Sequence, residues 1–391
     1  MTDTFDICMV LHDDVLHDSR IWREARSLNA QGWRVLVVCI ALGTTRLPDV
    51  QQMDGFTIWR VSPGLFRNRE VVRTTGKLIQ MALALPVVFR LIRRAQARVY
   101  HAHDFTGLVM TALAGIWRRP VVYDSHELFF DRTFRGLPRW IVNLLLLLRP
   151  LEKWLAHRSV AFIATSESHA DRLVENLDMP RPVIVRNAVD TRRLGDKAAD
   201  YPFVGEKRVI AHSGSLLDGR HLPELVEALG HLPDDVALVL MGRGPLGARL
   251  TQQAQAQAVG GRFAVVPPVH PDCVAPTLAQ ADMAVVLMTP ISMSSHLSLP
   301  NKFFESIAAG LPLVVSRIPE LERMVEQYDI GLVCDPTDPA DIADKIATLL
   351  HPDNLARYRA NAEKARQELT WANEEKKLLA VYQQIFAQIK D

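Results

Sequence analysis

The sequence predicts an α/β protein built from two Rossmann-like domains in tandem. Short apolar runs alternate with helical patterns along the chain, which is typical of βαβ units around a parallel sheet. The chain has 391 residues, more than a single hydrophobic core usually spans, so two domains are expected. A polar, irregular segment at residues 187–207 separates two series of such runs and is the expected linker.

The first series contains seven expected strands. They lie near residues 5–11, 34–40, 56–61, 98–102, 120–124, 160–165 and 182–186. After the first strand, residues 18–31 have the periodicity of an amphipathic helix, and Asp18 is suited to cap its start.

Two segments of this series, 77–92 and 140–148, are strongly apolar. Neither reaches the roughly 18–20 uninterrupted apolar residues of a membrane-spanning helix. Arginines flank both segments, and basic residues attract anionic lipid. The sequence therefore leaves two explanations open, which are helices buried by packing and helices that contact a membrane surface.

The second series begins after the linker. Its six strands are expected near residues 208–212, 236–241, 263–266, 283–287, 312–316 and 331–334. Residues 353–390 then read as helix with an interruption, where Thr370 or Asn373 could cap a new segment. The final segment, 374–390, carries so wide an apolar stripe at helical spacing that it needs a partner surface.

The composition argues against several classes of protein. A net charge of +1 gives no reason to expect nucleic acid as the main partner. The N-terminal residues lack the basic region of a secretory signal, so a cytoplasmic protein is expected. The cysteines have no paired spacing and predict neither a disulfide framework nor a zinc site; they are Cys8, Cys39, Cys273 and Cys334.

The segment Ser298–Ser316 combines a loop, a helix and a strand with polar groups at the helix start. Pro300 suits the first helical turn, Gly310 suits a left-handed helix end, and Pro312 prevents continuation. The free N–H groups of such a start bind anions, while Glu305 could accept hydrogen bonds from sugar hydroxyls. This arrangement indicates a nucleotide-sugar site, and an ordinary capped helix with a solvated glutamate is the alternative.

Two glycine-containing loops follow strands of the second series. In the loop at 213–220, glycines permit close approach of a ligand and Arg220 offers a guanidinium suited to pyrophosphate, although a plain glycine turn is the alternative. The run Gly242–Gly247 fits the dinucleotide-binding fingerprint. That fingerprint needs an acidic residue after the next strand, where Pro267–His270 offers none, so we expect no NAD site.

Histidines and carboxylates gather after two strands of the first series, at Tyr100–Asp104 and Asp124–Glu127. A metal site, satisfied polar groups at strand ends, and an active cleft are the three possible explanations. Side chains alternate between the faces of a strand, and we expect this alternation to keep His101 and His103 from sharing a metal.

The segment Ser298–Ser316 resembles the donor-site helix of the retaining family 4 glycosyltransferases, and within them a subgroup with Pro-Asn-Lys before Phe-Glu. Glu305 matches the second of two family glutamates, the one that binds the ribose hydroxyls. The first falls at Leu297, so this chain departs from the pattern in how the donor sugar is held. Gly214 and Arg220 match a family glycine and lysine.

Further departures concern the phosphate and acceptor sides. Ser215 replaces a family arginine that contacts phosphate, and the loop His12–Asp18 lacks the Gly-Gly common in the family. The resemblance nonetheless implies donor-binding roles for Gly214, Ser215, Arg220, Arg243, Val269, Leu299, Pro300, Asn301, Lys302 and Glu305. It implies catalytic roles for His126, His103, Asp104 and Arg220.

The resemblance also implies the GT-B fold with an active site in the cleft between two domains. The acceptor would bind to the first domain and the donor to the second, and the last helix would cross back onto the first. The expected divisions are 1–186, the linker 187–207, 208–371 and the terminal helix 372–391.

The implied reaction moves a sugar from a nucleoside-diphosphate sugar to a hydroxyl of a polysaccharide or lipid-linked saccharide, with retention. The departing diphosphate would help to deprotonate the acceptor, and protein cations would stabilise it without a divalent metal or other cofactor. The expected location is the cytoplasm, with possible contact at the cytoplasmic face of the membrane. A GT-B sugar-nucleotide epimerase and a catalytically weak nucleotide-sugar-binding protein are the alternatives.

Overall fold

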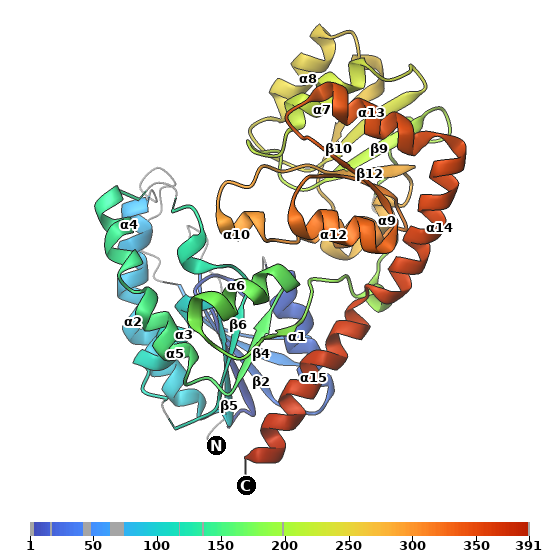
Figure 1. Ribbon diagram of the computed structural model, residues 1–391. Coiled ribbons are helices and arrows are strands. Elements are labelled where there is room, and N and C mark those ends of the chain that lie inside the picture. Colours follow the sequence, from blue (N-terminus) through green and yellow to red (C-terminus); the bar gives the residue numbers. More distant parts are fainter. Residues whose placement is uncertain are drawn as a thin grey trace. The chain divides into compact units, whose positions relative to one another are not determined.

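The computed structural model describes residues 4–15, 18–41, 48–62, 74–116, 118–134, 137–197 and 199–389. The chain forms two compact units, one made of Met1–Arg186 and Glu375–Asp391, the other of Asn187–Glu374 (Figure 1). Each unit has its own largely parallel sheet with helices packed against it. The predicted fold class, two Rossmann-like α/β domains, is confirmed.

The first unit contains an eight-stranded sheet in the order β3-β4-β2-β1-β5-β6-β7-β8. Its strands are β1 (Ile7–Val10), β2 (Val35–Ile40), β3 (Val50–Met53), β4 (Phe56–Val61), β5 (Val99–His103), β6 (Val121–Ser125), β7 (Ala161–Ala164) and β8 (Val183–Ile184). All seven predicted strands are present. The sequence analysis missed β3, which pairs antiparallel with β4 at the sheet edge and alternates exposed with half-buried residues.

The helices of the first unit are α1 (Ser19–Ala30), α2 (Thr74–Ala95), α3 (Asp104–Leu113), α4 (Arg139–Leu146), α5 (Arg149–Ala156) and α6 (Glu167–Leu177). Asp18 caps α1 as predicted, because its carboxylate accepts the N–H groups of Arg20 and Ile21. Among the described residues, none of the helices has the length and apolar character needed to span a bilayer.

The two apolar segments have different environments. In α2, Ala84, Val88 and Ile92 lie on one helix face and pack into the core against the sheet. Burial by packing therefore explains the apolar character of this face. In α4, by contrast, no residue is buried. Its Trp140 is 68% exposed and Leu144 is 58% exposed, so packing within the unit does not account for its apolar side chains.

The second unit contains a six-stranded sheet in the order β11-β10-β9-β12-β13-β14, with all pairs parallel. Its strands are β9 (Arg208–Ser213), β10 (Val236–Met241), β11 (Phe263–Val266), β12 (Met283–Val286), β13 (Leu313–Ser316) and β14 (Gly331–Cys334). These are the six strands that the sequence predicts, and most of their side chains are buried because helices cover both faces.

The helices of the second unit are α7 (Leu222–Gly230), α8 (Gly247–Ala256), α9 (Pro271–Leu278), α10 (Met293–His296), α11 (Asn301–Ala308), α12 (Pro319–Tyr328), α13 (Pro339–Leu350) and α14 (Pro352–Glu368). Pro300 is the residue immediately before α11, and Gly310 follows that helix with a φ of 72°, the left-handed conformation that the sequence predicts.

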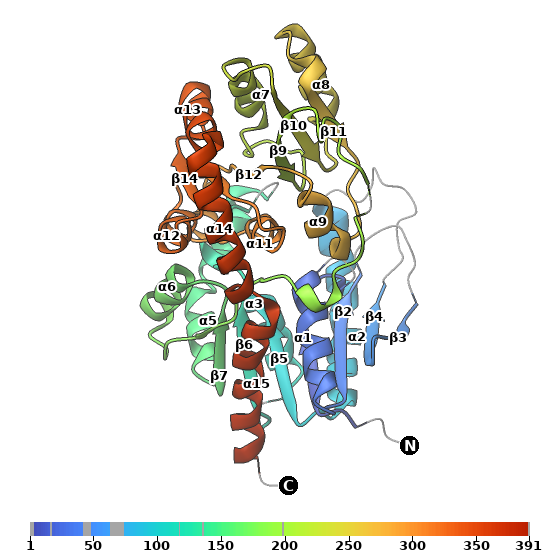
Figure 2. The same cartoon turned by 90° about the vertical axis from the view of Figure 1, so that its right-hand side faces the viewer.

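The last helix, α15 (Trp371–Gln388), begins in the second unit, and from Glu375 onward it belongs to the first (Figure 2). Its aromatic face is buried there. The Tyr382 hydroxyl lies 2.6 Å from His101 Nδ1, and the Phe386 ring stacks on Trp33 at a centroid distance of 4.9 Å. Residues far apart in sequence therefore complete the first unit.

Candidate functional site

The second unit has a pocket of about 260 Å³ where β9, β10 and β11 end. Its lining residues are Ser213, Gly214, Ser215, Met241, Gly242, Arg243, Pro268, Val269, Val274 and Glu305. Ligands of open parallel sheets bind at this edge, outside the carboxyl ends of the strands. The pocket brings together five predicted donor-site residues, namely Gly214, Ser215, Arg243, Val269 and Glu305.

Glycines allow two loops of this pocket to pack backbone against backbone. A Cβ atom on Gly242 would lie 1.8 Å from the carbonyl oxygen of Gly214, and one on Gly244 would lie 2.1 Å from that of Leu216. Both distances are impossible for real atoms, so only glycine fits at these positions. Loop packing thus accounts for two glycines of the fingerprint-like run Gly242–Gly247.

Glu305 is held at the pocket wall by a side chain that the sequence analysis did not single out. Glu305 is the fifth residue of α11, and its Oε2 accepts a hydrogen bond from Ser213 Oγ at 2.9 Å. Ser213 ends β9 and itself lines the pocket. The contact fixes the carboxylate at the strand ends, where it can bind a hydroxyl-rich ligand.

Basic groups gather behind this carboxylate. Lys302 is buried and its Nζ donates to the Leu287 carbonyl oxygen at 3.2 Å. Burial and the charge of Arg220 lower the pKa of Lys302 to about 7, with Glu305 opposing them. Burial also lowers the pKa of Arg220. Two cations held close together against their own repulsion favour an anionic ligand, since a bound anion relieves that repulsion.

His212 lies close to these basic groups but carries no charge of its own. It lies in β9 and is buried. Burial, followed by the charges of Lys302 and Arg220, lowers its pKa well below the ordinary value. His212 is therefore neutral and adds no positive charge beside Lys302.

The remaining predicted donor-site residues are not among those that line the pocket. Leu299 is buried in the core, Pro300 precedes α11, and Asn301 is its exposed first residue. Lys302 and Arg220 are also outside the lining set. Sequence reasoning missed Ser213, Met241 and Val274, whose types carry no local signal of ligand binding.

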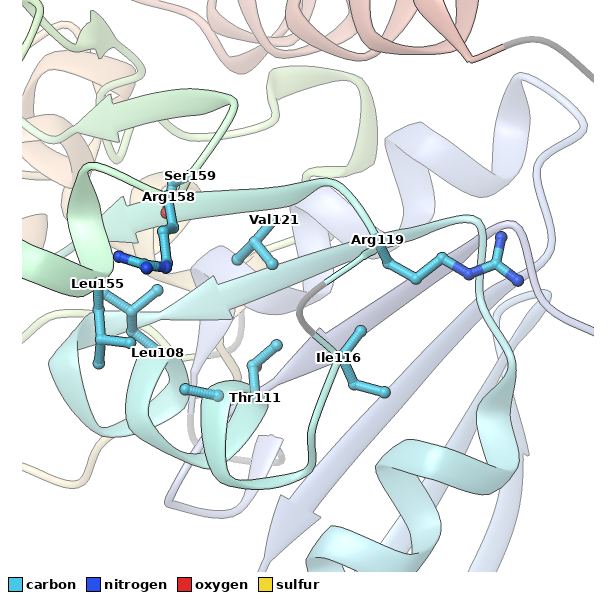
Figure 3. A pocket seen from close by; sticks show the side chains of 9 residues that line it. Leu108, Thr111, Ile116, Arg119, Val121, Leu155, Arg158 and Ser159 are labelled. Carbon is cyan, nitrogen blue, oxygen red and sulfur yellow. The ribbon is translucent and has the colours of Figure 1, made fainter.

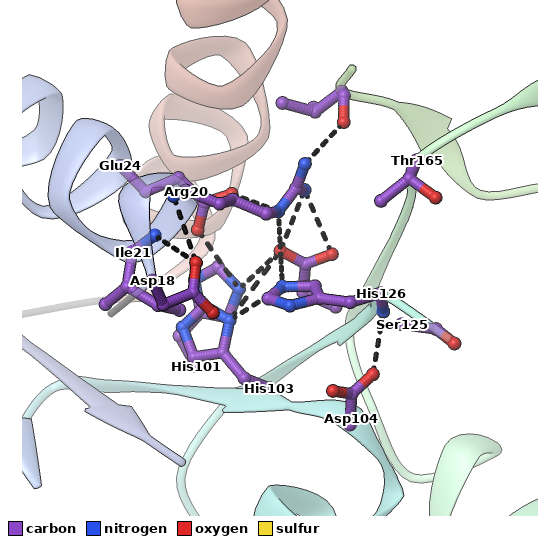
Figure 4. A network of polar contacts seen from close by, with 12 residues as sticks. Asp18, Arg20, Ile21, Glu24, His101, His103, Asp104, Ser125, His126 and Thr165 are labelled. Atoms are coloured by element: carbon purple, nitrogen blue, oxygen red, sulfur yellow. Dashed lines mark hydrogen bonds and ion pairs between the residues drawn. The ribbon is translucent and has the colours of Figure 1, made fainter. Parts of the chain in front are cut away.

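A second polar cluster lies in the first unit around Asp124, the next-to-last residue of β6 (Figure 4). Arg20 of α1 approaches Asp124 Oδ2 with Nη2 at 3.0 Å and contacts Glu24 with Nε at 2.8 Å. His126 Nε2 lies 3.2 Å from the same Asp124 oxygen. Arg20 and Asp124 are buried, so their charges interact strongly. Burial raises the pKa of Glu24 to about 8 although the charge of Arg20 opposes it.

The expectation that alternation separates His101 from His103 is wrong. Residues two apart in a strand share a face, and the two rings stack with centroids 4.2 Å apart. In Figure 4 both rings lie beside His126 and beneath Arg20. His103 Nδ1 is 3.1 Å from His126 Nε2, so the predicted residues His103 and His126 do meet.

His126 is the charged member of this histidine cluster. Burial opposes its ionisation, but the carboxylates of Asp124 and Asp104 outweigh burial and raise the pKa of His126 to about 10. Asp104 also holds the loop, because its Oδ1 accepts the backbone N–H groups of His126 at 2.8 Å and Glu127 at 3.2 Å. The His126 side chain is 15% exposed, so part of this cation can reach a ligand.

The same cluster contains residue types that bind metals. Ligand atoms of Glu24, His101, His103 and Asp124 all lie within 4.8 Å of one another. However, the Arg20 guanidinium already contacts both carboxylates and supplies the positive charge that they require. A divalent ion would have to displace or repel this arginine, so these residues do not fit a resident metal.

A small pocket in the first unit lies at the opposite edge of the sheet, near Val121 at the start of β6 (Figure 3). It holds about 30 Å³, enough for one or two water molecules. Arg119 points away from the other labelled side chains in Figure 3. This pocket is too small for a nucleotide.

Two family models match the chain, one in each half. The model described as "Glycosyl transferase 4-like domain" matches residues 18–188, and the model described as "Glycosyl transferases group 1" matches residues 207–352. The second match contains the whole pocket around Glu305, and the first contains the cluster around Asp124.

Curated relatives and solved structures agree with these matches. The chain is 25% identical over 403 residues to a D-inositol 3-phosphate glycosyltransferase of Xylanimonas cellulosilytica, over 92% of this chain and 89% of that protein. It is 30% identical over 176 residues to a GDP-mannose-dependent alpha-(1-6)-phosphatidylinositol dimannoside mannosyltransferase of Mycobacterium tuberculosis, over 44% of this chain and 43% of that one.

Among solved structures, sucrose-phosphate synthase from Thermosynechococcus elongatus superposes with a TM-score of 0.75 at 17% identity, covering 98% of this chain and 99% of that one. HepE from Anabaena, solved with UDP and glucose, has a TM-score of 0.72 at 17% identity, covering 97% of this chain and 100% of that one. At this identity the likeness shows a shared fold.

Proposed function

We propose that the chain, which matches a glycosyltransferase model in each half and has the GT-B fold, is a family 4 glycosyltransferase that moves a sugar from a nucleoside-diphosphate sugar to an acceptor hydroxyl, with retention of configuration. The observation that carries the proposal is the pocket of the second unit. There the Glu305 carboxylate, two glycine loops packed backbone to backbone, and the nearby Lys302 and Arg220 occur together.

The proposed donor site assigns each group a part of the nucleotide sugar. Glu305 binds the ribose hydroxyls with its carboxylate, which Ser213 holds at the pocket wall. Val269 and Pro268 line the space for the base. Arg220, Lys302 and the N-terminus of α11 attract the diphosphate, which carries the negative charge. HepE, of the same fold, was solved with UDP and glucose, which agrees with this class of donor.

The proposed reaction is a front-face displacement. The bond between the sugar's anomeric carbon and the diphosphate oxygen breaks, the bond to the acceptor oxygen forms on the same face, and the acceptor proton passes to the departing diphosphate. The main electrostatic task is to stabilise that diphosphate, which protein cations can do without a divalent metal. His126, with its pKa raised to about 10, is a further cation for the diphosphate or the sugar.

His103 and Asp104 have supporting roles in this proposal. Asp104 fixes the backbone that carries His126, and His103 contacts the His126 ring. Residues 1–186 of the first unit are assigned to the acceptor, and the second unit is assigned to the donor. The terminal helix joins the first unit at Glu375.

The proposed acceptor is a saccharide, either a polysaccharide or one linked to lipid. The exposed surface of α4 and the turn after it favours the lipid-linked class. Leu147 is 73% exposed there, and the exposed basic residue Arg139 begins α4. Apolar side chains with basic neighbours are suited to the surface of an anionic membrane.

One assay tests the function. Purified protein is incubated with radiolabelled UDP-, GDP- and dTDP-sugars and a lipid extract, with and without EDTA. Label that moves to the extract, in EDTA as well, supports the proposal, and activity lost in EDTA and restored by Mg²⁺ or Mn²⁺ refutes the metal-free mechanism. An isomerised nucleotide sugar would identify an epimerase, and binding alone would identify a non-catalytic protein.

A further inference from the structure

We propose that Tyr382, on the terminal helix α15, is a positioning residue that fixes the tautomer of His101 and, through Asp124, holds the His126 ring. The expected effect on catalysis rests on the proposed function of His126, whereas the assignment of the His101 tautomer is independent of that function. Tyr382 is fully buried, and its hydroxyl lies 2.6 Å from His101 Nδ1.

The direction of this hydrogen bond follows from the other side of the ring. His101 Nε2 lies 3.4 Å from Asp124 Oδ2 and 4.0 Å from Glu24 Oε2. Burial lowers the pKa of His101 despite the contact with Asp124, so the ring is neutral and carries one proton. That proton belongs on Nε2, where it faces carboxylate oxygen, and Nδ1 is left as an acceptor.

Tyr382 is then the donor. Burial, followed by the charges of Glu24 and Asp124, raises the pKa of Tyr382 well above its ordinary value, so the hydroxyl keeps its proton. A neutral phenol opposite a ring nitrogen that lacks a proton donates to it. The hydroxyl therefore prevents His101 from moving its proton to Nδ1.

The tautomer of His101 affects His126 because both histidines face the same oxygen of Asp124. The same oxygen faces His101 Nε2, His126 Nε2 at 3.2 Å, and Arg20 Nη2 at 3.0 Å. If Nε2 of His101 lost its proton, a lone pair would face that oxygen. Repulsion would then turn the His101 ring. His103 stacks on that ring, and His103 in turn contacts the His126 ring.

Several elements place titratable groups around His101. Cys8 of β1 lies near Tyr382 as a neutral thiol, because burial raises its pKa far above the ordinary value. The charged and titratable neighbours of the cluster are Arg20 and Glu24 from α1, His103 from β5, and Asp124 and His126 from β6 and the loop after it. Tyr382 is the member that α15 supplies.

The test compares Tyr382→Phe with Tyr100→Phe in the full-length protein. Tyr100 is also buried, lies next to His101 in β5, and bonds through its hydroxyl to the Ile92 carbonyl at 3.2 Å. Tyr100→Phe therefore removes a buried tyrosine hydroxyl, as Tyr382→Phe does, but that hydroxyl does not contact Asp124 or His101 Nδ1. Selective ¹⁵N-histidine labelling and NMR report which ring nitrogen of His101 carries the proton.

We expect the Nε2–H tautomer of His101 in the wild type and in Tyr100→Phe, and a mixture of tautomers in Tyr382→Phe. Turnover of Tyr382→Phe should fall about ten- to a hundredfold through misplacement of His126, with an unchanged KM for the donor. An Nδ1–H tautomer in the wild type, or unchanged tautomers in Tyr382→Phe, would overturn the proposal.

If Tyr382→Phe fails to fold, the wild-type spectrum alone decides, because the proposal requires Nε2–H there. A wild type that transfers no sugar would refute the proposed function. The His101 spectrum would still test Tyr382, so the two failures are distinguishable.

Discussion

At the scale of single residues, the proposed donor site depends first on Glu305. Glu305→Ala should weaken binding of a nucleoside diphosphate about ten- to a hundredfold, because hydrogen bonds to a charged group contribute roughly 1.5–3 kcal/mol. Titration calorimetry with UDP and GDP measures the change. Glu326→Ala, on the exposed side of α12, is the matched control and should bind normally. Unchanged affinity of Glu305→Ala would show that the carboxylate does not bind the nucleotide.

Lys302 should make nucleotide binding depend on pH. Its pKa is about 7 in the free protein, so near pH 7.5 much of it is neutral. A bound diphosphate favours the ammonium form and raises the pKa, so binding takes up a proton. Affinity should therefore fall as the pH rises above about 7.

Calorimetry in buffers of different ionisation enthalpy measures that proton directly. At pH 7.5 the observed binding enthalpy should vary with the buffer for the wild type and not for Lys302→Met. A buffer-independent enthalpy in the wild type would show that Lys302 does not respond to the ligand.

The residues of the donor pocket could be predicted only where the neighbouring sequence indicates a turn or a helix start. Glu305, Gly214 and Arg243 stand in turns and at a helix start whose glycines and prolines are visible in the sequence. Ser213 was missed because a serine at a strand end looks like any other. Tyr382 is 281 residues from His101, so no local pattern could connect them.

At the scale of elements, apolar runs predicted the buried strands because each is covered on both faces. The edge strand β3 is the exception, since Val50–Met53 is half polar and its partner is β4 alone. The same kind of limit applies to α4. Its apolar sequence indicated either burial or membrane contact, and only the structure shows that none of its residues is buried.

The exposed face of α4 should bind anionic membranes. The triple variant Trp140→Ser, Leu144→Ser and Leu147→Ser should lose most cosedimentation with vesicles of phosphatidylglycerol and phosphatidylcholine, because these side chains are 68%, 58% and 73% exposed. Val204→Ser, at an exposed apolar residue of the second unit, is the control.

Vesicles of phosphatidylcholine alone should bind the wild type weakly, because they carry no net negative charge to attract the flanking arginines. Equal binding of the triple variant and the wild type to anionic vesicles would contradict a membrane role for α4.

At the scale of the whole molecule, the second unit is one continuous stretch, Asn187–Glu374, and it contains all the pocket residues. A fragment of these residues should therefore fold and bind a nucleoside diphosphate without catalysing transfer. Circular dichroism checks folding, and calorimetry checks binding. A folded fragment that binds no nucleotide would show that the donor site needs the first unit.

The first unit is different, because it is discontinuous. Its two parts, Met1–Arg186 and Glu375–Asp391, are separated by the entire second unit. During synthesis at about 5–20 residues per second, the ribosome needs roughly 10–40 seconds to add that unit. Throughout this interval His101 has no tyrosine to bond with, and the surface that α15 covers stays open. Of the two units, the one whose synthesis begins first is thus completed last, and a growing chain with apolar surface still uncovered is prone to aggregate.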